Sequence, residues 1–99
     1  MRLTEQQIQV VKSTAHAVLG EDAQVTLFGS RLDDAKKGGD IDLLFSTSAN
    51  IDNPAYTVGR IYAQLVSQLG DQKIDILLKA PNLQLQSIHT LAEQSGVQL

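Results

Sequence analysis

The spacing of apolar residues along the chain predicts three helices and three strands. Apolar residues recur every three or four positions in the helical segments, and they are β-branched or clustered in the strand segments. The predicted order is a helix over 4–19, strands over 23–28 and 40–46, a helix over 55–69, a strand over 73–79 and a helix over 83–95. Residues 97–99 fit either a short edge strand or an unstructured tail.

Capping residues support these boundaries. Thr4 is a typical N-cap for the first helix, and Gly20, Gly70 and Gly96 follow the three helical segments directly. Together the elements have the order α-β-β-α-β-α, which predicts an α/β (α+β) fold with one small mixed sheet covered by helices. A helix joins the second and third strands, which allows them to pair in parallel through a right-handed crossover.

Composition limits what the chain can be. Its 99 residues, 42% of them hydrophobic, suit one domain over 1–99, and no repeat or linker divides it. A net charge of −3 makes nucleic acid an unlikely main partner, and the absence of cysteine excludes disulfides and thiolate metal sites. The chain has no apolar run near the ~20 residues of a membrane span and no apolar signal core. We expect a soluble, cytoplasmic domain.

Three aspartates lie on predicted strands, where acidic residues are uncommon. Asp40 and Asp42 share one face of their strand because side chains alternate, and Asp75 has the same position between isoleucines on the third strand. Close together, three such carboxylates repel one another unless a cation lies between them. Oxygen ligands of this kind suit two Mg²⁺ ions, or Mn²⁺, at a phosphoryl-transfer site.

A second motif, Phe28-Gly29-Ser30, ends the first strand just before a polar loop. Glycine lets the backbone approach a phosphate closely, Ser30 offers a hydroxyl and an N–H, and Arg31 supplies a charge-assisted bond. The other polar residues have ordinary interpretations. These are loop acids at Asp33 and Asp34, exposed charges at Lys36 and Lys37, surface or half-buried histidines at His16 and His89, and core or interface aromatics at Tyr56 and Tyr62.

The segment FGSRLDDAKKGGDIDLLF, followed later by KIDILL, resembles the minimal nucleotidyltransferases of the DNA polymerase beta superfamily. The resemblance covers essentially the whole chain. It implies the polymerase beta-like nucleotidyltransferase fold and triphosphate binding by Gly29, Ser30 and Arg31. It also implies that Asp40 and Asp42 bind the metals and are catalytic. Asp75 would bind metal as well and would activate the acceptor hydroxyl.

The resemblance also implies a reaction and a partner. From it we expect transfer of a nucleoside monophosphate, AMP from ATP, to a hydroxyl, and as acceptor a tyrosine on a small helical HEPN-type toxin in a toxin–antitoxin pair. Three alternatives stay open: a non-catalytic nucleotide-binding antitoxin, a subunit that needs a helical partner, in a homo- or hetero-oligomer, and a plain structural domain with coincidental aspartates.

Overall fold

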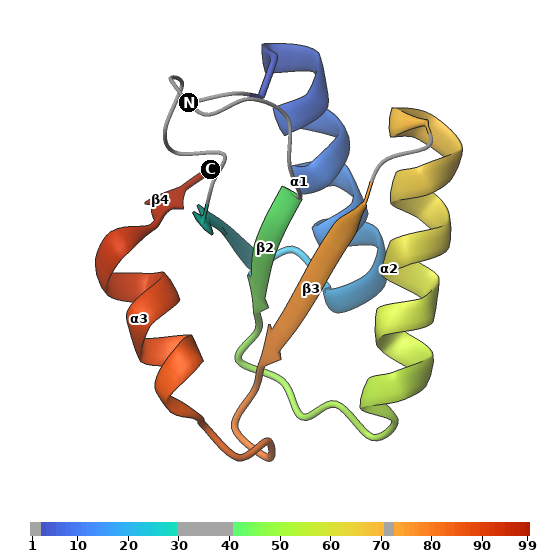
Figure 1. Cartoon of the computed structure of the whole chain (residues 1–99). Helices are drawn as coiled ribbons and strands as arrows, with labels where there is room; N and C mark the ends of the chain where they lie inside the picture. Colours follow the sequence, from blue (N-terminus) through green and yellow to red (C-terminus); the bar gives the residue numbers. More distant parts are fainter. Residues whose placement is uncertain (1–2, 30–40, 71–72) are drawn as a thin grey trace.

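The computed structural model of the chain describes residues 3–29, 41–70 and 73–99. The elements are, in order, α1 (Glu5–Leu19), β1 (Gln24–Phe28), β2 (Ile41–Ser46), α2 (Pro54–Leu69), β3 (Ile74–Lys79), α3 (Ser87–Ser95) and β4 (Val97–Gln98). Four strands form one mixed sheet in the order β3-β2-β1-β4 (Figure 1). The predicted α/β class is therefore confirmed, and the tail beyond Gly96 forms a short edge strand.

The sheet is mixed because its strands pair in two ways. β1 runs antiparallel to both β2 and β4, whereas β2 and β3 are parallel and are joined through α2. The parallel pairing inferred from the helical connection is confirmed. Because β2 and β3 are parallel, their first residues lie at one end of the sheet and their last residues at the other.

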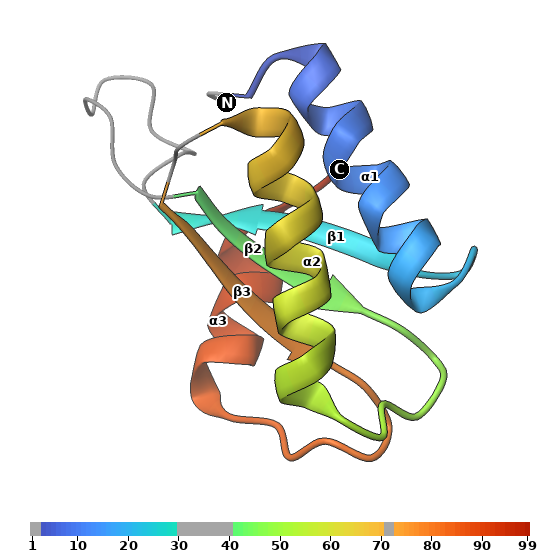
Figure 2. The same ribbon diagram turned by 90° about the vertical axis from the view of Figure 1, so that its right-hand side faces the viewer.

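The two faces of the sheet are covered differently. Figure 2 shows α2 in front of the sheet and α3 behind it. The main core lies between the sheet and the helices α1 and α2, and its fully buried side chains include Val11, Leu27, Leu43, Phe45 and Leu65. On the other face, Leu44 of β2 and Ala92 of α3 are buried, but they lie outside that main core.

Cross-strand partners divide this second face into three rows. We call Phe28, Asp42 and Asp75 the acidic row, since Asp42 is the register partner of both others. The middle row is Thr26, Leu44 and Leu77, and the cavity row is Gln24, Ser46 and Lys79. The acidic row and the cavity row therefore lie at opposite ends of the same face.

Most helix boundaries agree with the sequence prediction. Thr4 caps α1 as expected: its hydroxyl accepts from the Gln7 N–H at 3.1 Å, and the Gln7 side chain accepts from the Thr4 N–H at 2.9 Å. The start of the last helix was predicted wrongly, because α3 begins at Ser87 and not near residue 83. The Asn82 side chain accepts from the Ile51 N–H and donates to the Ile51 carbonyl, which holds this segment against a distant loop.

The close approach of α3 to β1 requires a glycine. A Cβ built on Gly96 would overlap the Ala92 carbonyl and the Thr26 side chain. The chain can therefore pass from α3 directly into β4, which pairs with β1. Within the described ranges, no helix is both long and apolar enough to cross a membrane.

Candidate functional site

The acidic row brings two of the three predicted aspartates together. Asp42 and Asp75 are register partners on adjacent parallel strands, so their side chains leave the same face of the sheet. Asp42 is half-buried and Asp75 is exposed, whereas the neighbouring Ile41 and Leu43 are fully buried on the opposite face. Neighbouring strands of a sheet lie about 4.8 Å apart, so two carboxylates at partner positions on them can share one cation.

Gly29 places the backbone against this pair. It follows directly on Phe28, the register partner of Asp42, and its φ of +78° lies in the left-handed region that favours glycine. A Cβ built on Gly29 would overlap the Asp42 carboxylate. The end of β1 and the first acid of the pair therefore lie in direct proximity.

The remaining predicted site residues, Asp40, Ser30 and Arg31, lie outside the described residues. The loop residues Asp33, Asp34, Lys36 and Lys37 do as well. Within the described part of the chain, no three His, Asp or Glu side chains form a metal-binding group. The described oxygen donors at this end are Asp42 and Asp75, and the predicted third donor remains a prediction.

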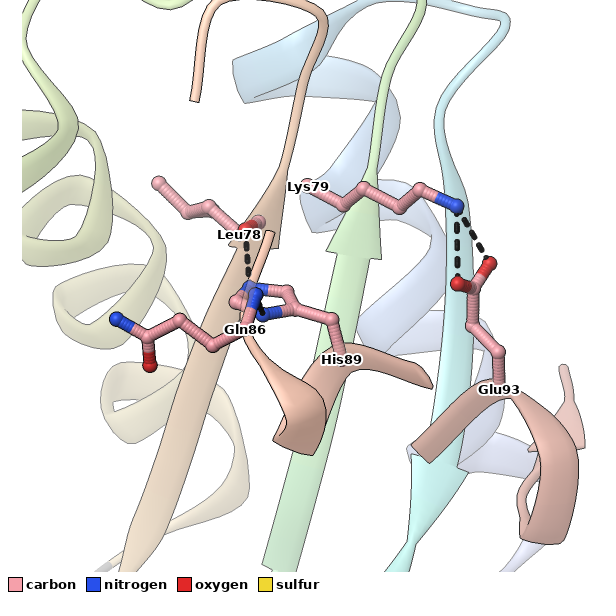
Figure 3. A network of polar contacts seen from close by, with 5 residues as sticks. All are labelled: Leu78, Lys79, Gln86, His89 and Glu93. Atoms are coloured by element: carbon pink, nitrogen blue, oxygen red, sulfur yellow. Dashed lines mark hydrogen bonds and ion pairs between the residues drawn. The ribbon is translucent and has the colours of Figure 1, made fainter. Parts of the chain in front are cut away.

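The two histidines have structural surroundings. His16 is exposed in the last turn of α1. His89 is buried: its Nε2 lies 2.9 Å from the Leu78 carbonyl oxygen, and its Nδ1 accepts from the Gln86 N–H at 3.1 Å (Figure 3). These partners fit a neutral ring with its proton on Nε2. His89 therefore joins the start of α3 to β3.

The two tyrosines are not core residues. Tyr56 and Tyr62 are 64% and 44% exposed on α2, and Arg60 lies 6.0 Å from the Tyr56 ring centre. An interface role for them stays a prediction.

The opposite end of the same face holds a cavity of about 730 Å³. Its wall includes the whole cavity row, the turn after β3 and one side chain of α3. The lining residues are Asp22, Gln24, Ser46, Thr47, Ser48, Lys79, Ala80, Pro81, Leu83, Leu85 and Glu93.

The charged groups of this cavity have partners within the protein. The Lys79 Nζ donates to both carboxylate oxygens of Glu93, at 2.8 and 2.9 Å (Figure 3). Asp22 Oδ2 accepts from the Ser48 hydroxyl and, at 3.3 Å, from the Ser48 N–H. These bonds, led by the hydroxyl, hold the pKa of Asp22 below its ordinary value of 3.8.

Sequence reasoning did not find this cavity, because no local pattern marks it. In the sequence, Lys79 is an ordinary cation at a strand end and Glu93 is an ordinary acid on a helix. The fold brings the two side chains together. The only local signal is the alternation of side chains along β3, which places Lys79 on the same face of the sheet as Asp75.

Comparison of the chain with protein-family models gives no match, and comparison with the curated proteins gives none either.

Proposed function

We propose that this protein is a magnesium-dependent nucleotidyltransferase with a polymerase beta-like fold. It transfers a nucleoside monophosphate, AMP from ATP, to a hydroxyl group and releases pyrophosphate. The observation that carries the proposal is the acidic row: Asp42 and Asp75 are register partners on parallel strands, with the backbone of Gly29 against Asp42. The resemblance in motif order, from Phe28-Gly29-Ser30 to Asp40 and Asp42 to Asp75, supports it further.

Each acid has a distinct task in this proposal. Asp40 and Asp42 hold two Mg²⁺ ions, or Mn²⁺, and Asp75 completes the metal set and accepts the proton of the acceptor hydroxyl. When bound there, the metal ions would lower the pKa of that hydroxyl and offset the charge of the triphosphate. The hydroxyl oxygen forms a bond to the α-phosphorus while the bond to pyrophosphate breaks.

The triphosphate lies at the end of β1. Gly29 leaves room for close backbone approach, and Ser30 and Arg31 hold phosphate oxygens through hydrogen bonds and charge. No side chain stands at position 29, since one there would overlap Asp42.

The acceptor is a tyrosine on a small helical HEPN-type partner, in a toxin–antitoxin pair. The exposure of Asp75 supports an acceptor that reaches the site from outside the chain. The competing proposal is a non-catalytic antitoxin that binds the nucleotide and covers the partner. It differs from the enzyme only in turnover.

Calorimetry with Mg²⁺–ATP tests the metal and nucleotide site directly. The wild-type protein should bind Mg²⁺–ATP and show a higher Tm in its presence, by linkage. Asp42→Asn should lose most of both effects, because it removes a metal ligand.

The matched control is Asp52→Asn, which removes an exposed aspartate outside the sheet. It should bind Mg²⁺–ATP as the wild type does. Equal responses in the wild type and Asp42→Asn would show that the cation binds elsewhere. Binding without any transfer to the partner would favour the non-catalytic antitoxin.

A further inference from the structure

The cavity at the far end of the α3-covered face lies outside the proposed transfer site. It is bounded by the last residues of the parallel strands β2 and β3, Ser46 and Lys79, whereas the acidic row lies near their first residues. In open α/β sheets, ligands bind in the crevice beyond the carboxyl ends of parallel strands. A volume of about 730 Å³ lies within the range of about 300–1,000 Å³ typical of small-molecule sites.

One part of the cavity wall is apolar. Ala80, Pro81, Leu83 and Leu85 follow β3 in the turn toward α3. Leu85 is 54% exposed, so part of its apolar side chain lies in contact with water. Covering it would remove apolar area from water, so an apolar ligand group is favoured here.

The remaining wall is polar and carries one excess negative charge. Lys79 and Glu93 neutralise each other through two short hydrogen bonds. Asp22 differs, because its described partner, Ser48, is uncharged. Asp22 is ionised at neutral pH, because even the ordinary pKa of an aspartate, 3.8, lies well below 7. The lining thus combines an uncompensated anion with apolar surface and with the neutral polar groups of Gln24, Ser46 and Thr47.

We propose that this cavity is a second binding site, and that its ligand is a small organic cation with an apolar body. Asp22 binds the amine, amidine or guanidine group, and Pro81, Leu83 and Leu85 cover the apolar body. Anions should bind poorly, because the Lys79 ammonium already donates to the Glu93 carboxylate. The site does not depend on nucleotide transfer at the acidic row.

Three probes that share a benzene ring separate charge from shape. Benzamidine carries a positive charge, benzamide is neutral and benzoate is negative. Each is titrated into ¹⁵N-labelled protein, and amide shifts are followed at residues 46–48, 79, 80 and 82–85. Benzamidine should shift these amides with an affinity at least tenfold above that of benzamide, and benzoate should leave them unchanged.

Two variants and one control assign the binding groups. Asp22→Asn keeps an acceptor for Ser48 but removes the charge, and it should weaken benzamidine at least tenfold. Glu21→Gln removes the adjacent exposed charge, which does not line the cavity, and it should change nothing. Leu85→Ser, at an exposed position, should weaken benzamidine and benzamide by similar factors.

Other results would overturn the proposal. Equal binding of benzamidine to the wild type and Asp22→Asn would remove Asp22 from the site. Shifts confined to residues 42 and 75 would place the cation at the acidic row. The result is independent of the transferase proposal, because Asp75→Asn should leave benzamidine binding unchanged even if no nucleotide binds.

Discussion

The two ends of the α3-covered face differ in how their charged side chains are arranged. In the acidic row, two carboxylates occupy directly opposing positions on neighbouring strands. Around the cavity row, Lys79 pairs with Glu93, and Asp22 accepts two hydrogen bonds from Ser48. The same sheet therefore places two carboxylates side by side at one end and joins a lysine to a glutamate at the other.

This difference indicates where an external ion contributes most. A cation between two carboxylates at partner positions on neighbouring strands would interact with both of them. The ion pair between Lys79 and Glu93 is already formed and its side chains are partly exposed, so an added ion should contribute little to stability there. The acidic row is thus the end of the sheet where bound metal should change stability and chemistry.

The largest expected effect is on transfer. Asp75→Asn should keep appreciable Mg²⁺–ATP binding, while the rate of transfer to the partner falls by about 10²–10⁴-fold, the usual scale for a lost general base. Labelled-monophosphate transfer measured beside calorimetry tests both parts. If Asp75→Asn transfers at the wild-type rate, the assignment of proton acceptance to Asp75 is wrong.

Gly29→Ala tests the packing of the acidic row. The new Cβ would overlap the Asp42 carboxylate and would force alanine into a left-handed φ, so the free energy of unfolding should fall by about 1–3 kcal/mol. Urea denaturation measures it. The matched control is Gly59→Ala in α2, where a Cβ meets nothing within 4 Å. That change should stabilise the protein by about 0.5–1 kcal/mol, because alanine favours helix. A neutral Gly29→Ala would mean that the end of β1 does not lie against Asp42.

A smaller effect is expected at the cavity row. Lys79→Met removes the ion pair with Glu93, whose side chain is 41% exposed. Exposed pairs contribute about 0.2–1 kcal/mol, so the loss of unfolding free energy should lie in that range and shrink at high salt. Glu93→Gln should behave alike. A much larger, salt-independent loss would show that the pair is essential to the fold, and the contrast with the acidic row would then fail.

The smallest effect concerns acid stability. Hydrogen bonds from Ser48 keep the pKa of Asp22 in the folded protein below the value of 3.8 that it has when unfolded. Its contribution to stability is therefore present above that value and is lost as the pH falls through the folded pKa. The difference in Tm between the wild type and Asp22→Asn should narrow as the pH is lowered below 3.8. A difference that stays constant would mean that the carboxylate gains nothing from Ser48.

Local patterns were enough for the elements and for the shared face of the acids. Helical spacing and the Thr4 cap located α1, and period-two alternation placed Asp42 and Asp75 away from the core. What the sequence could not supply was register: a shift of β3 by two residues would keep every face assignment, yet it would separate the two acids.

Long-range contacts account for the rest. The late start of α3 depends on Asn82 reaching the backbone of Ile51, and the burial of His89 depends on the Leu78 carbonyl. The cavity needs Asp22, Lys79 and Glu93 to converge from separate elements. None of these contacts leaves a local pattern in residue type or spacing.

The pairing of β4 with β1 has a consequence for the order of folding. Thr26 pairs with Gln98 and Leu27 with Val97, and the Leu99 N–H donates to the Val25 carbonyl at 2.9 Å. Closing so long a loop costs more chain entropy than closing the connection from β1 to β2. Contacts between segments so distant in sequence form slowly. We therefore expect the two-residue β4 to dock late in folding, and its amide hydrogens to exchange with solvent before those of the central strands.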